Sequence, residues 1–383
     1  MSAHNYFELT RIMPSDEVEL RREYASSIYD AMKFYEPTFH MTLVHLASIM
    51  ITPLDKLEQI RSTSLMFTFM GCLPPLLKRY LIENPVIPKS YMTVDPKHSI
   101  PGDSEHQRNL CRKRDNYKCV FLPNTPNDVK VAHIVPPTWV DTQETMETII
   151  KTMDDACFLT GFHDIDKYLS LFVDEYKRGT SDKCWNMISL DQTLYWYFKN
   201  RYMGLKCLGI EYTEDDAKAT VIIQLTHIYR TTNYPMENAT IEGDGNHFDD
   251  IVMGIRKFEH QCNLPYIEGQ QCMPPTTISV LSGMCTRIEM SNDDAKKCKF
   301  MLDISWRLSM IAGICGAAAY SRYLPDHDSW SLIVRDLSIN AWVEDQARLH
   351  SESQDSNEML ELDRGCQHDG NDMERKRKVN LIN

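Results

Sequence analysis

A short alternating run at residues 129–135 constrains the fold of this chain more than any other feature. Apolar and polar side chains alternate along it, and Pro136-Pro137 stops it. Alternation with a period of two is typical of a half-buried β-strand. Residues 117–122 form a second strand-like run, and a polar turn at 123–128 separates the two runs. Strand, turn and strand in about twenty residues predict a β-hairpin.

The segment before this hairpin carries apolar residues at helical spacing. A helix is predicted over residues 16–34, with Ser15 as its N-cap. Its apolar face would consist of Leu20, Tyr24, Ile28 and Met32. A second helical pattern opens at Pro53. Pro74-Pro75 predicts a break within the helical pattern of residues 65–82, because proline lacks a backbone donor and clashes with the preceding turn.

The segment after the hairpin mixes both periodicities. The patterns predict a helical insert at 142–176, a helix start at Asp191, strands at 205–212 and 219–229, a loop-rich stretch at 231–275, and helices at 299–320 and 330–348. The helix at 299–320 would present one apolar stripe formed by Met301, Ile304, Leu308, Ile311 and Ile314. Helices and strands are therefore interspersed, as in an α+β fold.

Composition shifts divide the chain into four parts. We predict a helical N-terminal region with a proline-rich linker over 1–104, a core with an insert over 105–230, an extension of the core over 231–349, and a disordered tail over 350–383. Within residues 84–104, four prolines mark the linker. The tail ends in a basic run, Arg375 to Lys378, which would act as a nuclear import signal if it is recognised.

Charge and cysteine spacing narrow the classes of function. The net charge of −13 disfavours nonspecific nucleic-acid binding, because phosphate supplies affinity only where Lys and Arg meet it. The 12 cysteines include no CxxC pair, so they predict reduced thiols and no structural zinc. No apolar run reaches the roughly 18 residues of a membrane helix, and the first residues lack an apolar signal core. We therefore expect an intracellular protein, cytoplasmic or nuclear, that does not bind membranes.

Three motifs in a fixed order carry the most specific information. Arg114-Asp115-Asn116-Tyr117-Lys118-Cys119 is followed by Ala132-His133-Ile134-Val135-Pro136, and then by Asn186 with Tyr195 nine residues later. This arrangement resembles the HNH nuclease family, in particular its fungal members, over roughly residues 105 to 320. The resemblance implies a ββα-metal (HNH-like) core with extra strands, a helical N-terminal region and a C-terminal helix.

The resemblance also implies roles for single residues. His133 would be the general base, Asn186 would position the hairpin or bind the metal, and Tyr195 occupies the position of the last metal-binding histidine. A phenol with a reference pKa of about 10 is a poor replacement for an imidazole ligand. Ala132 stands where some members carry an acidic ligand. We therefore expect impaired or lost nuclease activity, and no cofactor unless the site still holds a divalent metal.

Each of these residues also has a purely structural interpretation. His133 could be a satisfied core histidine, Asn186 a residue that ties a turn, and Tyr195 a packing residue. Cys111 and Cys119 are expected to be inert buried thiols. The acidic stretch 243–250 resembles a calcium loop but lacks the distal glutamate, so a solvated loop is favoured.

Three functions stay open at this level. The first is a divergent HNH-like protein acting on nucleic acid. The second is a non-nuclease enzyme on the same scaffold, such as an accessory or cyclising enzyme of fungal secondary metabolism acting on a small molecule. The third is a binding or regulatory protein without chemistry.

Overall fold

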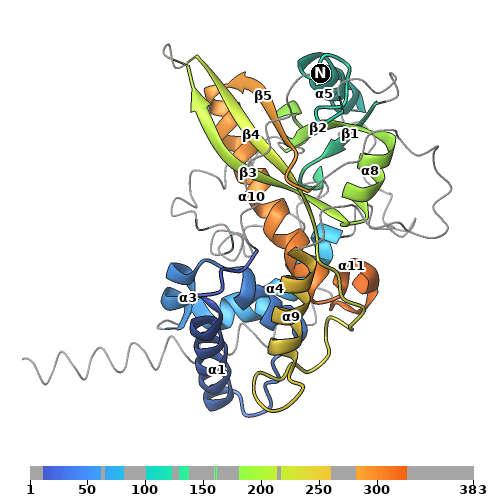
Figure 1. The fold of residues 1–383 in the computed structure, drawn as a ribbon. Coiled ribbons are helices and arrows are strands. Elements are labelled where there is room, and N and C mark those ends of the chain that lie inside the picture. The colour runs from blue at the N-terminus through green and yellow to red at the C-terminus, as the bar shows by residue number, and fades with distance from the viewer. Residues whose placement is uncertain are drawn as a thin grey trace, which may run out of the picture.

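The protein has an α+β fold with two small antiparallel sheets and a group of N-terminal helices. One long helix extends from the larger sheet to these helices (Figure 1). The computed structural model describes residues 12–61, 65–81, 101–122, 129–137, 159, 161, 181–213, 217–259 and 282–325. Several predicted segments lie outside the described residues: the linker over 84–100, most of the insert at 142–176, the helix at 330–348, and the tail with its basic run.

The N-terminal region is helical, as predicted. It consists of α1 (Val18–Tyr35), α2 (Leu43–Ile51), α3 (Leu54–Arg61) and α4 (Leu65–Leu81). The N-cap of α1 is Glu17, two residues after the predicted Ser15. Every residue of α2 is buried, because α1, α4 and the long helix α10 (Asn292–Ile314) pack around it.

The predicted break at Pro74-Pro75 is wrong, because both prolines lie inside the continuous helix α4. Leu73, Leu76, Leu77 and Tyr80 around them are each at most 1% exposed. Burying a large apolar side chain stabilises a fold by about 1.5–3 kcal/mol, so several together offset the roughly 3 kcal/mol cost of a helical proline. Burial of the apolar face of α4 therefore outweighs the local tendency of proline to end a helix.

A three-stranded antiparallel sheet lies at the other end of the molecule. The sheet has the order β3-β4-β5, formed by β3 (Met203–Tyr212), β4 (Lys218–His227) and β5 (Cys285–Ser291). The first two strands confirm the predicted ones. A bulge between Cys207 and Gly209 shifts the register of β3. Helix α10 packs along β3 and continues to α2 and α4, so it connects the sheet to the helical region (Figure 1).

The second sheet differs from the predicted hairpin. Strand β1 (Val129–His133) pairs with β2 (Met187–Asp191) and not with residues 117–122. Residues 117–122 form no strand, since the backbone of Asn116 and Tyr117 turns through positive φ angles of 55° and 56° after α5 (Pro101–Arg114). Val120 makes a single backbone contact with β2, in which its N–H donates to the carbonyl of Ser189 at 3.1 Å. Helix α5 begins at Pro101, so it includes residues 101–104, which were predicted to belong to the linker.

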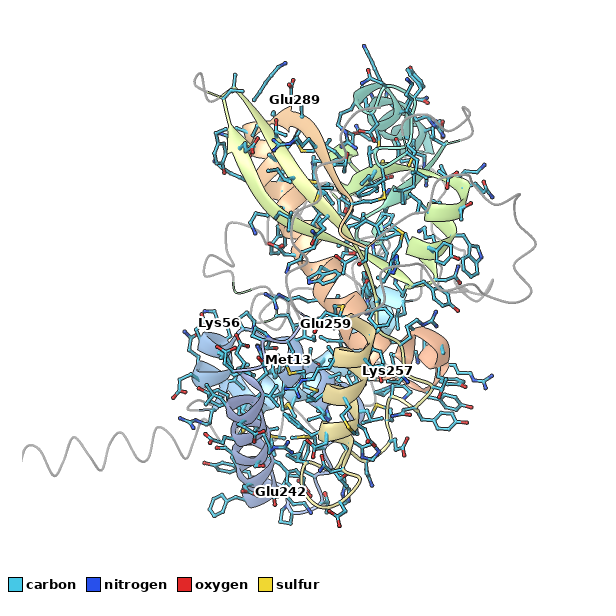
Figure 2. The ribbon with its side chains drawn as sticks, viewed as in Figure 1. Met13, Lys56, Glu242, Lys257, Glu259 and Glu289 are labelled. Atoms are coloured by element: carbon cyan, nitrogen blue, oxygen red, sulfur yellow. The ribbon has the colours of Figure 1, made fainter. Side chains whose placement is uncertain are left out.

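The stretch predicted to be loop-rich contains a helix, α9 (His247–Glu259), which packs near the N-terminal helices. The N–H of Ile12 donates to Glu259 at 2.6 Å, and Figure 2 shows Met13 and Glu259 close together. Arg22 of α1 pairs with Asp249 at 2.6 Å. These contacts are long-range in sequence, so the local pattern could not reveal them.

Helix α10 begins seven residues before its predicted start, with Ser291 as N-cap, and its predicted apolar stripe is buried. It ends at Ile314, and two residues later Gly316 has a φ of 81°, in the left-handed region that favours glycine. After this turn come α11 (Ala317–Tyr320) and the 3₁₀ turn η5 (Ser321–Tyr323). Within the described residues no single helix could span a membrane; α10 and residues 317–323 reach that length only as a pair bent by 87°.

Candidate functional site

The candidate site lies where β1, β2 and α8 (Gln192–Lys199) form a ββα unit. Asp191 ends β2 and caps α8, because its Oδ1 accepts from the N–H groups of Thr193 at 2.9 Å and Leu194 at 3.1 Å. Helix α8 packs against both strands. The β1–β2 register places His133 opposite Met187, next to Asn186. His133 and Asn186 therefore lie at the same end of the two strands.

His133 is the last residue of β1, and its side chain is 7% exposed. Its Nε2 lies 2.8 Å from Oδ1 of Asp182, whose side chain is 22% exposed. A carboxylate at one ring nitrogen fixes the tautomer and the orientation of an imidazole and leaves the other nitrogen as the base. Geometrically, the pair can therefore act in acid–base chemistry.

Asn186 is fully buried and engaged with the backbone. Its Oδ1 accepts from the N–H of Val135 at 3.0 Å, and its Nδ2 donates to the carbonyls of Val135 at 2.9 Å and Ser181 at 3.0 Å. The backbone carbonyl of Asn186 accepts from Ile134 at 2.9 Å. The amide thus ties the segment after β1 to the segment that carries Asp182, which is a positioning role.

Tyr195 lies on α8, half-buried, and packs against the main apolar core. The Nζ of Lys199 lies 5.6 Å from the centre of its ring. Its neighbour Trp196 stacks on Tyr202 with 5.5 Å between ring centres. The helix therefore presents an aromatic face where the resemblance implies a metal-binding imidazole.

An ion pair between Arg114 and Asp115 fastens α5 to this unit. Nε of Arg114 lies 2.7 Å from Oδ1 of Asp115, and their side chains are 10% and 1% exposed. The guanidinium also donates to the carbonyls of Cys184 and Met187, each at 2.9 Å, and Oδ2 of Asp115 accepts from the N–H of Ser189 at 3.0 Å. Burial lowers the pKa of Arg114, but the hydrogen bonds and charge of Asp115 raise it more, so the cation is firmly held.

The cysteines of the motif region are poor nucleophiles. Burial raises the pKa of Cys111 to about 12, although Arg114 opposes this effect. Burial likewise raises the pKa of Cys119, whose sulfur accepts from the N–H of Leu122 at 3.3 Å. A thiol that does not ionise near neutral pH is inert, so both cysteines are packing residues.

The acidic stretch 243–250 caps α9. Oδ1 of Asn246 accepts from the N–H of Asp249 at 2.9 Å, and the carboxylate of Asp249 pairs with Arg22. The hydrogen bonds from Arg22 and Asn246 lower the pKa of Asp249. These carboxylate contacts serve the packing of α9 on α1. In the part of the chain that the structure describes, no three His, Cys, Asp or Glu side chains come together as a metal site.

Sequence reasoning missed Asp182, the partner of His133. The two are 49 residues apart, and the intervening insert gives no spacing rule that would join them. The only available signal was an acidic residue four positions before Asn186. Comparisons with protein-family models, with curated proteins and with solved structures found no match for this chain.

Proposed function

We propose that this chain is a divergent HNH-like ββα protein in which His133 and Asp182 form an acid–base pair and metal-dependent nuclease activity is impaired or lost. The observation that carries the proposal is the 2.8 Å contact between His133 and Asp182 at the end of β1, inside a strand–strand–helix unit. Asn186 supports it, since its amide holds the segments on both sides of the pair.

The residues around the pair favour impaired metal binding. A neutral phenol at Tyr195 and a methyl group at Ala132 offer no strong ligand for Mg²⁺ or Zn²⁺. Asn186 uses both ends of its amide on backbone groups. A divalent ion at this place would therefore depend on His133 and the carboxylate of Asp182, which is two ligands where zinc takes four and magnesium six, and its affinity would be low.

A second candidate is a metal-free acid–base enzyme that acts on a small molecule, such as an accessory or cyclising enzyme of fungal secondary metabolism. Asp182 favours it, because a carboxylate orients the imidazole of His133 without any metal. With the Nε2 proton directed to Asp182, Nδ1 carries the lone pair that takes a proton from substrate. Asp182 then stabilises the imidazolium by its charge.

Plasmid nicking with Mg²⁺, Mn²⁺ or Zn²⁺ tests the first proposal. We expect no more than trace nicking by the wild type, and by Tyr195→His at best weak nicking at low salt, because one imidazole does not restore the remaining ligands. His40→Ala, at an exposed histidine between α1 and α2, is the matched control for the loss of an imidazole. Robust nicking by the wild type that disappears in His133→Ala would make this chain a working nuclease and overturn the proposal.

Modification by diethyl pyrocarbonate tests the second candidate. The reagent acylates accessible neutral imidazoles, and mass spectrometry of peptides locates the adduct. His45 is the internal control, because it is fully buried and both its ring nitrogens have partners. We expect His133 to react well before His45 in the folded protein. Equal protection of both histidines would argue against an open acid–base site.

A further inference from the structure

A cluster of charged side chains lies between β3 and α10, away from the ββα unit. Lys299, Asp303 and Arg307 follow one another at four-residue spacing, so they share one face of α10. Lys206 of β3 adds a third cation, with its Nζ 5.9 Å from the ring of Trp306. All of these side chains are half-buried.

Positive charge exceeds negative charge inside this cluster. Three cations share one carboxylate, that of Asp303, which pairs with Lys299. Two charged groups outside the cluster also affect the pKa of Arg307: Arg21 from α1 lowers it and Asp55 from α3 raises it. Arg21 is itself paired with Glu17 at 2.7 Å. The local charge is therefore cationic in a chain whose net charge is −13.

Arg307 and Lys206 have donors without a hydrogen-bond partner among the described residues. Arg307 gives Nη1 to the carbonyl of Ile51 at the end of α2, at 2.6 Å, and among the described residues its Nε and Nη2 have no partner. Lys206 makes no hydrogen bond or ion pair to any described residue. Burial and the nearby charge of Arg307 lower the pKa of Lys206, and the charge of Asp303 opposes them only in part. Half-burying such charges is costly unless an anion compensates them.

The geometry points to an anion-binding site formed by Lys206 and Arg307, with inorganic phosphate or a phosphate monoester as its ligand. The planar guanidinium of Arg307 offers two N–H groups side by side, which match two oxygens of a tetrahedral anion. Lys206 supplies the second charge, as a dianion requires. The ring of Trp306 lies beside them and provides an apolar wall for the rest of an ester.

This site is separate from the acid–base pair. Nζ of Lys297 on α10 lies 5.9 Å from the centre of the ring of Trp185, the neighbour of Asn186. Arg307 follows ten residues later, which corresponds to about 15 Å along a helix at 1.5 Å per residue. The inference therefore does not depend on the proposed function of His133.

Calorimetric titration of the full chain with sodium phosphate tests the inference, at constant ionic strength set by chloride. We expect saturable binding that Lys206→Gln weakens at least about tenfold, because a charge-assisted hydrogen bond is lost. Lys206→Arg should retain binding. Lys218→Gln is the matched control, since Lys218 lies at the other end of the sheet and pairs with Glu289 at 2.6 Å, the residue that Figure 2 labels there.

Two further ligands identify the chemistry of the anion. Phenyl phosphate that binds more tightly than phosphate supports a monoester, and equal affinity supports free phosphate. Acetate that binds as tightly as phosphate would overturn the assignment of a dianion. The inference also fails if the wild type shows no saturable phosphate binding, or if Lys218→Gln weakens binding as much as Lys206→Gln. Circular dichroism melts confirm that each variant is folded.

Discussion

The side chains of Asp115 and Leu46 are both buried, in two different regions of this molecule, but their surroundings differ. The carboxylate of Asp115, 1% exposed, holds a cation and a backbone N–H in the region of the ββα unit. Leu46, 0% exposed, lies in the helical region among other apolar side chains. The first environment fixes directions and distances, whereas the second requires mainly volume.

This difference in surroundings shows which region can hold polar side chains in a fixed geometry for catalysis or binding. Around the ββα unit, Arg114, Asp115, Asn186 and the His133–Asp182 pair all use specific hydrogen bonds. Such contacts keep side chains within the small tolerances that catalysis or binding demands. In the helical region apolar burial predominates, and fewer buried polar groups, such as His45 and Arg21, are held by specific hydrogen bonds.

The largest expected effect is that of Asp115→Asn. The substitution keeps the shape of the side chain but leaves Arg114 as a buried cation without its counter-charge, which should cost about 3–5 kcal/mol of unfolding free energy. Urea unfolding measures it. Glu105→Gln on the same helix is the control, because it only breaks the exposed pair with Arg112 and should cost less than about 1 kcal/mol. Equal losses in both variants would contradict the comparison.

The helical region contains a pH-sensitive buried histidine, His45, whose pKa is lowered to about 4 by burial, while a hydrogen bond to Met70 opposes the shift. The unfolded chain has a histidine pKa of about 6.5, so it binds more protons than the folded chain between pH 6.5 and 4. The stability that neutral His45 contributes is therefore complete above pH 6.5 and lost as pH falls towards 4, by about 3 kcal/mol in total.

The comparison of wild type with His45→Gln isolates this effect, because all carboxylates titrate in both proteins. The neutral ring is required by geometry: Nδ1 accepts from the N–H of Thr42 at 3.1 Å, and Nε2 lies 2.8 Å from the carbonyl of Met70. We expect the stability of the wild type to fall more steeply with acid than that of the variant. Parallel curves of unfolding free energy against pH would refute the assignment.

Tyr80→Phe tests the junction between the two regions, at which α4 meets α10. The hydroxyl of Tyr80 bonds to Ser309 at 2.6 Å and to Ser305 at 2.8 Å, and all three residues are buried. Removal of the hydroxyl leaves two buried hydroxyls with fewer partners and should cost about 2 kcal/mol. The ring remains for Arg201, whose guanidinium carbon lies 4.2 Å from its centre. An unchanged urea midpoint would show that the junction depends on apolar contact alone.

Leu46→Met is the counterpart of Asp115→Asn, a conservative change in the apolar environment. Because volume is nearly conserved and methionine is flexible, the cost should be about 1 kcal/mol. A loss as large as that of Asp115→Asn would show that the helical region is as exacting as the ββα unit.

The smallest effect is expected from truncation before Ser351. Residues 351–383 contain few apolar side chains and many charges, so they cannot repay their ordering entropy. The melting temperature should stay nearly unchanged. A fall of many degrees would mean that this segment docks on the rest of the protein.

The sequence by itself determined the elements with a clear period. The helices α1 and α3, the strands β1, β3 and β4, and the buried stripe of α10 all follow from local spacing of apolar residues, which depends only on the geometry of a helix or a strand. The sequence also singled out His133 and Asn186, because they belong to the ordered motifs on which the family resemblance rests.

The tertiary structure alone decided which elements meet. Strand β1 pairs with β2, so Val129 meets Asp191 across a long insert, while the nearer run at 117–122 turns away through positive φ angles. Burial keeps α4 helical through Pro74-Pro75. The contact of His133 with Asp182 arises in the same way. Each of these outcomes depends on free energy gained between distant segments, and a local pattern contains no information about that term.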